Sequence, residues 1–434
     1  MRPADLAGWL ALIETLHPRP IALGLERVRE VLGRMGVALG CPVVTVAGTN
    51  GKGSTTAFCD AMLRAAGYAT GRYTSPHLLR YNERVALGGE AVGDAALVEA
   101  FHAVEDARTA AASPTPLTYF EFGTLAALWL FARARPDAVV LEVGLGGRLD
   151  AVNVVDADVA VVTSVDLDHT EYLGPSREHV GREKAGVFRP GRPAVCGDRS
   201  PPDSVLAHAR AIGAPLLLIG RDFDAIAQGA QWRYRGPGGD RYGLPIPALR
   251  GEFQLGNAAC AIAALGCLRD RLPVDAGAIR EALVRITWPG RFQVLPGRPT
   301  IVLDVAHNPQ AARALGTALG AMGFHPTTTA VLAMLADKDV DGVIAALRER
   351  IDRWEVATLP GPRGATAQAL RERLLASGIA AGAIRAHDDV ARAYEAAAAA
   401  AAEADRIVVF GSFLTVAAAM ARGRPASAPA GTRP

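Results

Sequence analysis

A glycine-rich stretch between an apolar run and a helical pattern constrains this chain most. The stretch, GTNGKGST at positions 48–55, follows apolar residues 43–46 and precedes a helical pattern over 54–66. Small residues at such a turn let backbone N–H groups converge on phosphate oxygens, and the helix N-terminus adds positive potential. The stretch therefore predicts a triphosphate cradle in an α/β fold, with Lys52 at the outer phosphates and Ser54 or Thr55 near Mg²⁺.

The stretch departs from the standard P-loop pattern GxxxxGK[ST]. Val46 stands where the first glycine belongs, and Gly53 separates Lys52 from Ser54. This departure disfavours generic kinases and GTPases, and the chain also lacks an N-K-x-D tetrapeptide to recognise guanine. A solvated turn rich in Gly and Asn is the alternative, which the flanking strand and helix disfavour.

Length and charge limit the class of protein. A chain of 434 residues exceeds one ordinary core, and a formal net charge of +2 argues against a nucleic-acid tail or a polybasic membrane patch. No apolar run approaches a membrane span, and Asp5 and Glu14 interrupt the apolar N-terminus, unlike a secretory signal. We expect a cytoplasmic protein of two or three domains that binds neither nucleic acid nor membranes.

The cysteines suggest no metal or redox site. They are odd in number, scattered, and without a C-x-x-C pair: Cys41, Cys59, Cys196, Cys260 and Cys267. We expect reduced thiols in or near the core.

Short β-branched runs alternate with longer helical stretches, which predicts a mainly parallel sheet covered on both faces. In the first part of the chain we expect strands at 43–46, 138–142 and 159–164, and helices at 54–66, 118–134 and 176–187. Between 228 and 250 the pattern changes to that of a small antiparallel hairpin.

A second α/β unit follows the stretch WPGR at position 288. Its expected strands are 300–305, 329–333, 354–358 and 406–411, and the alanine-rich run 396–402 is expected to be helical. We predict a P-loop-containing sheet domain with a small antiparallel element over 1–292, a Rossmann-like domain over 298–421 and a disordered tail over 422–434.

Polar residues follow the strands beside the glycine-rich loop. Glu142 ends the run 138–142, and Asp166, Asp168 and His169 follow the run 159–164. Mg²⁺ prefers oxygen ligands, and α/β folds bind ligands at the carboxyl ends of their strands. Glu142 is therefore a candidate metal ligand. His169 is either a ligand or a structural histidine, and Asp168 could equally cap a turn.

Three further stretches each admit two interpretations. GLGGRL at 144 resembles a dinucleotide fingerprint, but Leu149 replaces its last glycine, which disfavours a dehydrogenase. The pair of Glu183 and Lys184 is either a surface ion pair or functional. DVAHNP at 304 is either a polar turn before a helix or part of a ligand site.

Taken together, the motifs resemble those of the folylpolyglutamate synthase/dihydrofolate synthase family, within the Mur-type ATP-dependent amide ligases. The resemblance spans nearly the whole chain in order. The matching motifs are GTNGKGST at 48, TSPHL at 74, TYFEFGTLAAL at 118, EVGLGGRLDAVNV at 142, TSVDLDH at 163, EKAGVF at 183, WPGRF at 288, DVAHNP at 304 and GSF at 411.

The resemblance implies roles for individual residues. The ATP-binding residues would be Asn50, Gly51, Lys52, Gly53, Ser54, Asn257, Arg291, Asp304 and His307. The Mg²⁺ ligands would be Ser75, Glu142 and His169. The pteroate-binding residues would be Ala22, Leu23, Gly24, Leu25, Thr118, Tyr119, Phe120, Glu121, Leu149, Asp150 and Ala151. Lys184 matches the lysine that the family carries as a carbamate, and Lys52, Lys184 and His169 would serve catalysis.

The same resemblance implies the reaction. ATP would activate the carboxylate of dihydropteroate or a reduced folate as an acyl phosphate, which the amino group of L-glutamate attacks. The expected cofactors are ATP, two Mg²⁺ and CO₂ as the lysine carbamate, without an organic prosthetic group. We expect a monomer whose partners are small-molecule substrates.

Three alternatives remain open. The chain could have only folylpolyglutamate synthase activity. It could be another Mur-type amino-acid ligase, although a P-loop near residue 48 leaves no room for the uridine-nucleotide domain of the cell-wall enzymes. It could also be a nucleotide-gated module without chemistry.

Overall fold

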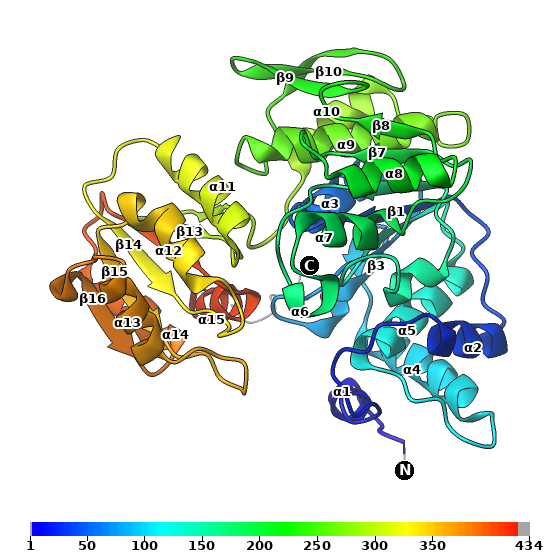
Figure 1. The fold of residues 1–434 in the computed structure, drawn as a ribbon, viewed down its shortest axis with the longest axis horizontal. Helices are drawn as coiled ribbons and strands as arrows, with labels where there is room; N and C mark the ends of the chain where they lie inside the picture. Colours follow the sequence, from blue (N-terminus) through cyan, green and yellow to red (C-terminus); the bar gives the residue numbers. More distant parts are fainter. Residues whose placement is uncertain (1, 424–434) are drawn as a thin grey trace, which may run out of the picture. The chain divides into compact units, whose positions relative to one another are not determined.

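The computed structural model describes residues 2–423, which form two compact units. The first unit comprises the chain up to Ala248 and Gln254–Ile286. The second unit comprises the short stretch Leu249–Phe253 and the chain from Thr287 onward. Each unit has its own sheet and its own apolar core (Figure 1). The functional domain limits predicted from the sequence, 1–292 and 298–421, stay predictions.

An eight-stranded sheet organises the first unit, in the order β4-β3-β2-β5-β1-β6-β7-β8. In this spatial order, the six strands β2, β5, β1, β6, β7 and β8 run parallel to one another. Strands β3 and β4 extend the β2 edge in antiparallel fashion. Its strands are β1 (Val43–Ala47), β2 (Thr70–Tyr73), β3 (Val85–Leu87), β4 (Glu90–Ala91), β5 (Ala138–Glu142), β6 (Val159–Val162), β7 (Ala194–Cys196) and β8 (Leu216–Leu218). Strands β1, β5 and β6 are buried at every residue, as expected of a parallel sheet covered on both faces.

Helices of the first unit bury large aromatic side chains. Trp9 of α1 packs edge-on against Phe101 of α4, which packs against Phe122 of α5. The helices are α1 (Leu6–Ile13), α2 (Glu26–Met35), α3 (Lys52–Ala65), α4 (Asp94–Thr109), α5 (Tyr119–Ala134), α6 (Thr170–Leu173), α7 (Arg177–Ala185), α8 (Asp203–Ala211), α9 (Phe253–Cys267) and α10 (Ala276–Arg285), with 3₁₀ helices η1 (Tyr81–Arg84) and η2 (Ala151–Val154).

The antiparallel hairpin predicted between 228 and 250 is confirmed, and a third strand extends it. It comprises β9 (Asp224–Gln228), β10 (Gln231–Arg235) and β11 (Arg241–Pro245), in the order β11-β10-β9. The sequence pattern missed β9 because its side chains are half-buried or exposed and show no strong apolar alternation.

The second unit contains a six-stranded sheet in the order β12-β13-β17-β14-β15-β16, parallel except for β12. Its strands are β12 (Gln293–Leu295), β13 (Thr300–Leu303), β14 (Thr328–Leu332), β15 (Arg353–Ala357), β16 (Ile384–His387) and β17 (Arg406–Phe410). Its helices are α11 (Pro309–Gly320), α12 (Val340–Leu347), α13 (Ala367–Ala376), α14 (Val390–Ala400) and α15 (Phe413–Gly423), with 3₁₀ helices η3 (Arg348–Arg350) and η4 (Ala381–Ala383).

The predicted fold class is confirmed, with local corrections at helix ends. Helix α3 begins at Lys52 rather than at residue 54, so Lys52 and Gly53 belong to its first turn. Helix α14 ends at Ala400, before the alanine run does. The tail predicted over 422–434 begins inside α15, which runs to Gly423, and residues 424–434 lie outside the described residues.

Two expectations from composition can also be compared with the structure. All five cysteines are free thiols, three buried and two half-buried, as predicted. Within residues 2–423, none of the helices is both long enough and apolar enough to cross a membrane.

Candidate active site

The glycine-rich loop connects β1 to α3. Gly51, the residue before α3, has a φ of 85°, a conformation that glycine adopts readily, and no side chain caps the helix there. A Cβ on Gly51 would also lie 2.5 Å from the Asn257 Oδ1 of α9. The N-terminus of α3 therefore presents backbone N–H groups that no side chain caps, as phosphate binding requires.

The end of β6 holds this loop in place. Thr49 N–H donates to the Ser164 carbonyl at 2.8 Å, and Asn50 N–H donates to the Ser164 Oγ at 3.1 Å. Thr163 Oγ1 donates to the Asn50 carbonyl at 2.6 Å. These contacts join the phosphate loop to the strand end that the sequence identified as a second source of site residues.

Lys52 folds across the loop. Its Nζ donates to the carbonyl oxygens of Gly48 at 3.0 Å and Thr49 at 3.2 Å. The ammonium group therefore lies over the loop itself, where the sequence places the triphosphate.

Behind the loop, α9 supplies a buried amide that sequence reasoning missed. Gln254 is fully buried, and its Nε2 donates to Ser54 Oγ at 3.3 Å. Asn257 Nδ2 donates to Gln254 Oε1 at 2.9 Å, so the structure brings Asn257 to the phosphate loop. A glutamine on the buried face of an alanine-rich helix was the only sequence signal for Gln254.

The candidate metal ligands follow the carboxyl ends of three strands of the same sheet, β2, β5 and β6. Ser75 follows β2 and donates its N–H to Glu142 Oε2 at 3.2 Å, and Glu142, which ends β5, is 4% exposed. His169 follows β6 with a φ of 51°, and its Nε2 lies 3.9 Å from Asp168 Oδ1. The structure thus brings Ser75 to Glu142. Among the residues that the structure describes, no three His, Cys, Asp or Glu side chains group closely enough to hold a metal ion.

Lys184 of α7 is buried, with 3% of its surface exposed, so the surface ion pair that the sequence left open is excluded. Burial and, to a smaller extent, the charge of Lys52 together lower the pKa of Lys184 to about 7, against the opposing effect of Asp168 and Asp150. Lys184 therefore lies within the electrostatic reach of the phosphate loop, the β6 end and the segment around Asp150.

Three segments expected to contact pteroate lie together; we call them the folate segments (Ala22, Leu23, Gly24 and Leu25; Thr118, Tyr119, Phe120 and Glu121; Leu149, Asp150 and Ala151). Gly24 N–H donates to the Leu149 carbonyl at 3.2 Å. A Cβ on Gly144 would lie 2.6 Å from Phe120 Cζ, so that ring covers the glycine-rich turn after β5.

Arg27 of α2 connects two of the folate segments, and sequence reasoning missed it. Its Nη2 donates to the Ala22 carbonyl at 2.8 Å and to Glu121 Oε1 at 2.7 Å. Glu121 Oε2 also accepts the N–H of Thr118 at 2.8 Å, which caps α5. The Glu121 carboxylate therefore accepts hydrogen bonds from the Arg27 guanidinium group and from the Thr118 backbone. An arginine on an amphipathic helix looks solvent-exposed in a sequence, so Arg27 gave no signal.

Asp150 is buried at 3% exposure and organises its own turn. Its Oδ2 accepts Leu145 N–H at 2.8 Å, and its Oδ1 accepts Val152 N–H at 3.0 Å. Burial raises the pKa of Asp150 to about 7, although these N–H groups and the charge of Lys52 favour its ionised form. This carboxyl can therefore change its charge near neutral pH.

The second unit has its own cluster of predicted residues. Asp304, after β13, accepts the N–H groups of Phe292 and Ala306, each at 2.8 Å, and burial raises its pKa, against the effect of Arg291. The Arg291 guanidinium lies 5.0 Å from the ring centre of Phe413, and the His307 ring lies 6.4 Å from the same ring. The structure thus places Arg291 and His307 beside Phe413, and both act electrostatically on the buried Asp304 carboxyl.

Family models and solved structures match this arrangement. The Mur ligase middle domain matches residues 46–265, and the Mur ligase, glutamate ligase domain matches residues 290–413. A dihydrofolate synthase/folylpolyglutamate synthase of Escherichia coli (strain K12) is 46% identical over 418 residues, covering 96% of this chain and 95% of the relative. The structure of E. coli FolC in complex with DHPP and ADP is similar with a TM-score of 0.91 and 45% identity, covering 96% of this chain and 97% of that one.

A second solved structure contains the other ligands of such a reaction. It is a bifunctional folylpolyglutamate synthase/dihydrofolate synthase with Mn, AMPPNP and L-glutamate bound, similar with a TM-score of 0.88 and 45% identity, covering 96% of this chain and 98% of that one. The fold, the phosphate loop and these matches define an ATP-dependent amide-forming ligase. The chain belongs to the dihydrofolate synthase/folylpolyglutamate synthase family of Mur ligases, as the motifs predicted.

Proposed function

We propose that this enzyme joins L-glutamate to dihydropteroate, forming dihydrofolate, and adds further glutamates to reduced folates. One observation carries the proposal: buried Lys184 lies within the electrostatic influence of both Lys52 on the phosphate loop and Asp150 in a folate segment. A carboxylate held by the folate segments would thus lie near the phosphates. The relatives whose structures contain DHPP with ADP, or AMPPNP with L-glutamate, support the same substrates.

The chemistry follows from the weakness of a carboxylate as an electrophile. The carboxylate of the pteroate or folate attacks the γ-phosphorus of ATP, ADP leaves, and an acyl phosphate forms. The amino group of L-glutamate then attacks the acyl carbon, and phosphate leaves through a tetrahedral intermediate. Phosphoryl transfer depends chiefly on positioning and on neutralising charge, and Lys52 and the N-terminus of α3 supply both. We assign ATP-binding roles to Asn257 in the first unit and to Arg291, Asp304 and His307 in the second.

The residues at the strand ends fit a divalent cation. Glu142 and Ser75 offer oxygen donors next to each other, which suits Mg²⁺ or Mn²⁺, and His169 would add a nitrogen donor. Mg²⁺, when bound, would neutralise the charge that develops on the phosphates. We propose that Ser75, Glu142 and His169 hold it.

We also propose that Lys184 reacts with CO₂. The neutral amine attacks the carbon of CO₂ and releases a proton, which leaves an anionic carbamate able to help position a second Mg²⁺. A pKa of about 7 supports this step, because an appreciable fraction of the amine is neutral near neutral pH. Intact-peptide mass spectrometry in bicarbonate should show a mass increase of one CO₂ on the peptide containing Lys184, lost in Lys184→Met. A bare amine in bicarbonate would contradict the carbamate.

ADP release with each acceptor tests the function. The bifunctional enzyme should release ADP with dihydropteroate plus L-glutamate and with tetrahydrofolate plus L-glutamate. ADP release with tetrahydrofolate plus L-glutamate, and none with dihydropteroate plus L-glutamate, would indicate that the enzyme has only folylpolyglutamate synthase activity. No glutamate-dependent release with either acceptor would contradict the proposed function and favour another Mur-type ligase or a nucleotide-gated module. The cytoplasmic location and the monomeric state stay predictions.

A further inference from the structure

Helix α7, which contains Lys184, ends directly against Gly147 and Arg148, the two residues before the folate segment 149–151. Arg148 N–H donates to the Glu183 carbonyl at 2.8 Å. A Cβ on Gly147 would lie 2.9 Å from the Glu183 carbonyl oxygen and 3.0 Å from that of Lys184. The two backbones are therefore in direct contact, and a shift of one must displace the other because close-packed interiors transmit strain.

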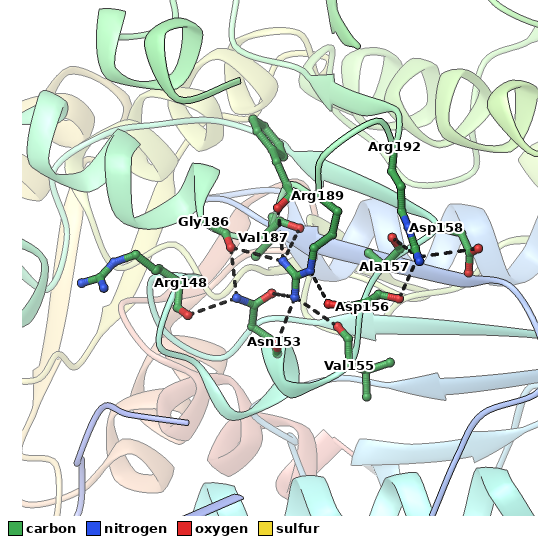
Figure 2. Close-up of polar contacts among 11 residues, drawn as sticks. Arg148, Asn153, Val155, Asp156, Ala157, Asp158, Gly186, Val187, Arg189 and Arg192 are labelled. Carbon is green, nitrogen blue, oxygen red and sulfur yellow. Dashed lines mark hydrogen bonds and ion pairs between the residues drawn. The ribbon is translucent and has the colours of Figure 1, made fainter. Parts of the chain in front are cut away.

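Arg189 lies four residues after the end of α7. All three of its guanidinium nitrogens make hydrogen bonds, which connect the turn after α7 to residues 153–156 (Figure 2). Its Nη1 donates to the carbonyls that follow the helix, Gly186 at 3.4 Å, Val187 at 3.1 Å and Phe188 at 3.2 Å. Its Nη2 donates to the carbonyl and Oδ1 of Asn153, both at 3.0 Å. Its Nε binds Asp156, and this contact holds the pKa of that carboxyl below its usual range.

Asn153 completes the connection from the other side. It lies in η2, directly after the folate segment 149–151, and is 5% exposed. Its Nδ2 donates to the Arg148 carbonyl and to the Gly186 carbonyl, both at 3.0 Å. The Asn153 side chain, which follows the folate segment, thus binds Arg148 before that segment and Gly186 after α7. Arg189 donates to the oxygen of the same side-chain amide.

We propose that Arg189 and Asn153 are positioning residues for the ligase reaction: they hold the folate segment 149–151 and the Lys184 helix at one fixed separation. The inference rests on the proposed function, because that function places the acceptor on 149–151 and a catalytic group on Lys184. Neither residue is assigned to substrate contact. A planar fork that binds carbonyls on two segments fixes distance and direction together, which an ammonium group cannot do.

Arg192 provides a matched control on the same turn. Its Nη1 donates to the carbonyls of Asp156 at 3.3 Å and Ala157 at 2.8 Å, and lies 3.8 Å from Asp158 Oδ1. All three partners precede β6, and none belongs to α7 or to the folate segments (Figure 2). Arg192→Lys therefore changes contacts that precede β6, including one to Asp156, which Arg189 also binds, and leaves the bonds of Arg189 to Asn153 and to the carbonyls after α7 in place.

The test compares Arg189→Lys with Arg192→Lys in the full-length enzyme. With Arg189→Lys, we expect kcat/KM for dihydropteroate to fall by about tenfold to a hundredfold, because small misplacements of reacting groups cost that much. KM for ATP and the affinity for ADP should change by less than about twofold, because the phosphate loop is not part of the connection. Arg192→Lys should match the wild type in all three values. A purely structural role would instead lower the amount of active enzyme without changing either KM.

Two further measurements keep the inference falsifiable. In Arg189→Lys, hydrogen exchange should rise at amides 147–155 and 183–188 and stay unchanged at 48–54. This measurement does not depend on whether the wild type accepts dihydropteroate. It therefore distinguishes a failure of the positioning role from a failure of the proposed function. In a double-mutant cycle with Asn153→Ala, the combined loss should be smaller than the product of the single losses, because both residues act through one contact. Unchanged exchange, equal effects of the two lysine variants, or fully multiplicative losses would each overturn the inference.

Discussion

The phosphate loop and the folate segments are held by different kinds of contact. The loop is fixed by backbone groups and neutral hydroxyls from the β6 end, Thr163 and Ser164. Charged side chains help to hold the folate segments, because Arg27 binds Glu121 and Arg189 binds Asn153, two residues after the segment 149–151. A carboxylate capping α3 would compete with phosphate for the same N–H groups, so neutral supports suit an anion site.

This difference in contacts predicts how substitutions in the phosphate loop and near the folate segments will affect the enzyme. Removing charge from the phosphate loop should abolish chemistry without loosening the protein, because the Lys52 ammonium group donates to carbonyls of its own loop. Removing charge near the folate segments should loosen the fit of one substrate, because arginines there connect separate segments.

Lys52→Ala should reduce glutamate-dependent ADP release by at least about a hundredfold, because one charged group aimed at the phosphates is lost at the transition state. Its thermal midpoint should stay within about 2 °C of the wild type, because Lys52 is half-buried and its bonds to the Gly48 and Thr49 carbonyls stay within one loop. Steady-state kinetics and a thermal melt measure both. Turnover within a few-fold of the wild type would remove Lys52 from the reaction and erase the contrast between the regions.

Lys184→Met should stabilise the unliganded protein by about 4 kcal/mol near pH 7, because burying an ammonium group is costly. The pKa of Lys184 is about 7 in the folded state and near its ordinary value in the unfolded chain. Between these values the unfolded chain binds more protons, so wild-type stability rises with pH. The advantage of the methionine is therefore complete below the folded pKa and should disappear toward roughly pH 10.

Denaturant unfolding of Lys184→Met in bicarbonate-free buffer at the two pH values measures this effect. Lys338→Met, in the second unit, is the control for removing one lysine. An advantage that does not change with pH would mean that the methionine stabilises by packing and that Lys184 is not held partly neutral.

Gly147→Ala should lower kcat/KM for dihydropteroate by about tenfold, because the added Cβ would press on the carbonyls of Glu183 and Lys184 and separate α7 from the folate segment. ADP affinity should not change. Gly33→Ala in α2, where a Cβ meets nothing within 4 Å, is the control and should be neutral in kinetics. Equal behaviour of the two variants would show that this backbone contact does not matter to the acceptor.

The elements that sequence reasoning predicted are those with strong local patterns. Strand β5 has its predicted bounds because five consecutive residues are buried, and α5 begins after Thr118, where the capping pair with Glu121 ends the preceding loop. The motifs likewise identified the family and the residues around the phosphate loop. Their roles in catalysis stay predictions.

What sequence reasoning missed depends on partners far apart in the chain. Arg27 and Glu121 are 94 residues apart, and Gln254 and Ser54 are 200 apart. Spacing patterns report which face of one element is apolar, but they contain no information on which distant group a buried polar side chain meets. Arg189 was overlooked for the same reason, since its partners come from η2 as well as from its own turn.

Arg27→Met should have the smallest effect, raising KM for dihydropteroate by about threefold to tenfold with kcat nearly unchanged. Arg27 supports the first folate segment through the Ala22 carbonyl and Glu121, while Gly24 keeps its backbone bond to Leu149. Arg34→Met on the same helix is the control, because Arg34 binds Ala107, Thr115 and Glu30 instead. If Arg27→Met reduced kcat and ADP affinity as strongly as acceptor binding, arginine contacts would support the phosphate loop too, and the two regions would not be held independently.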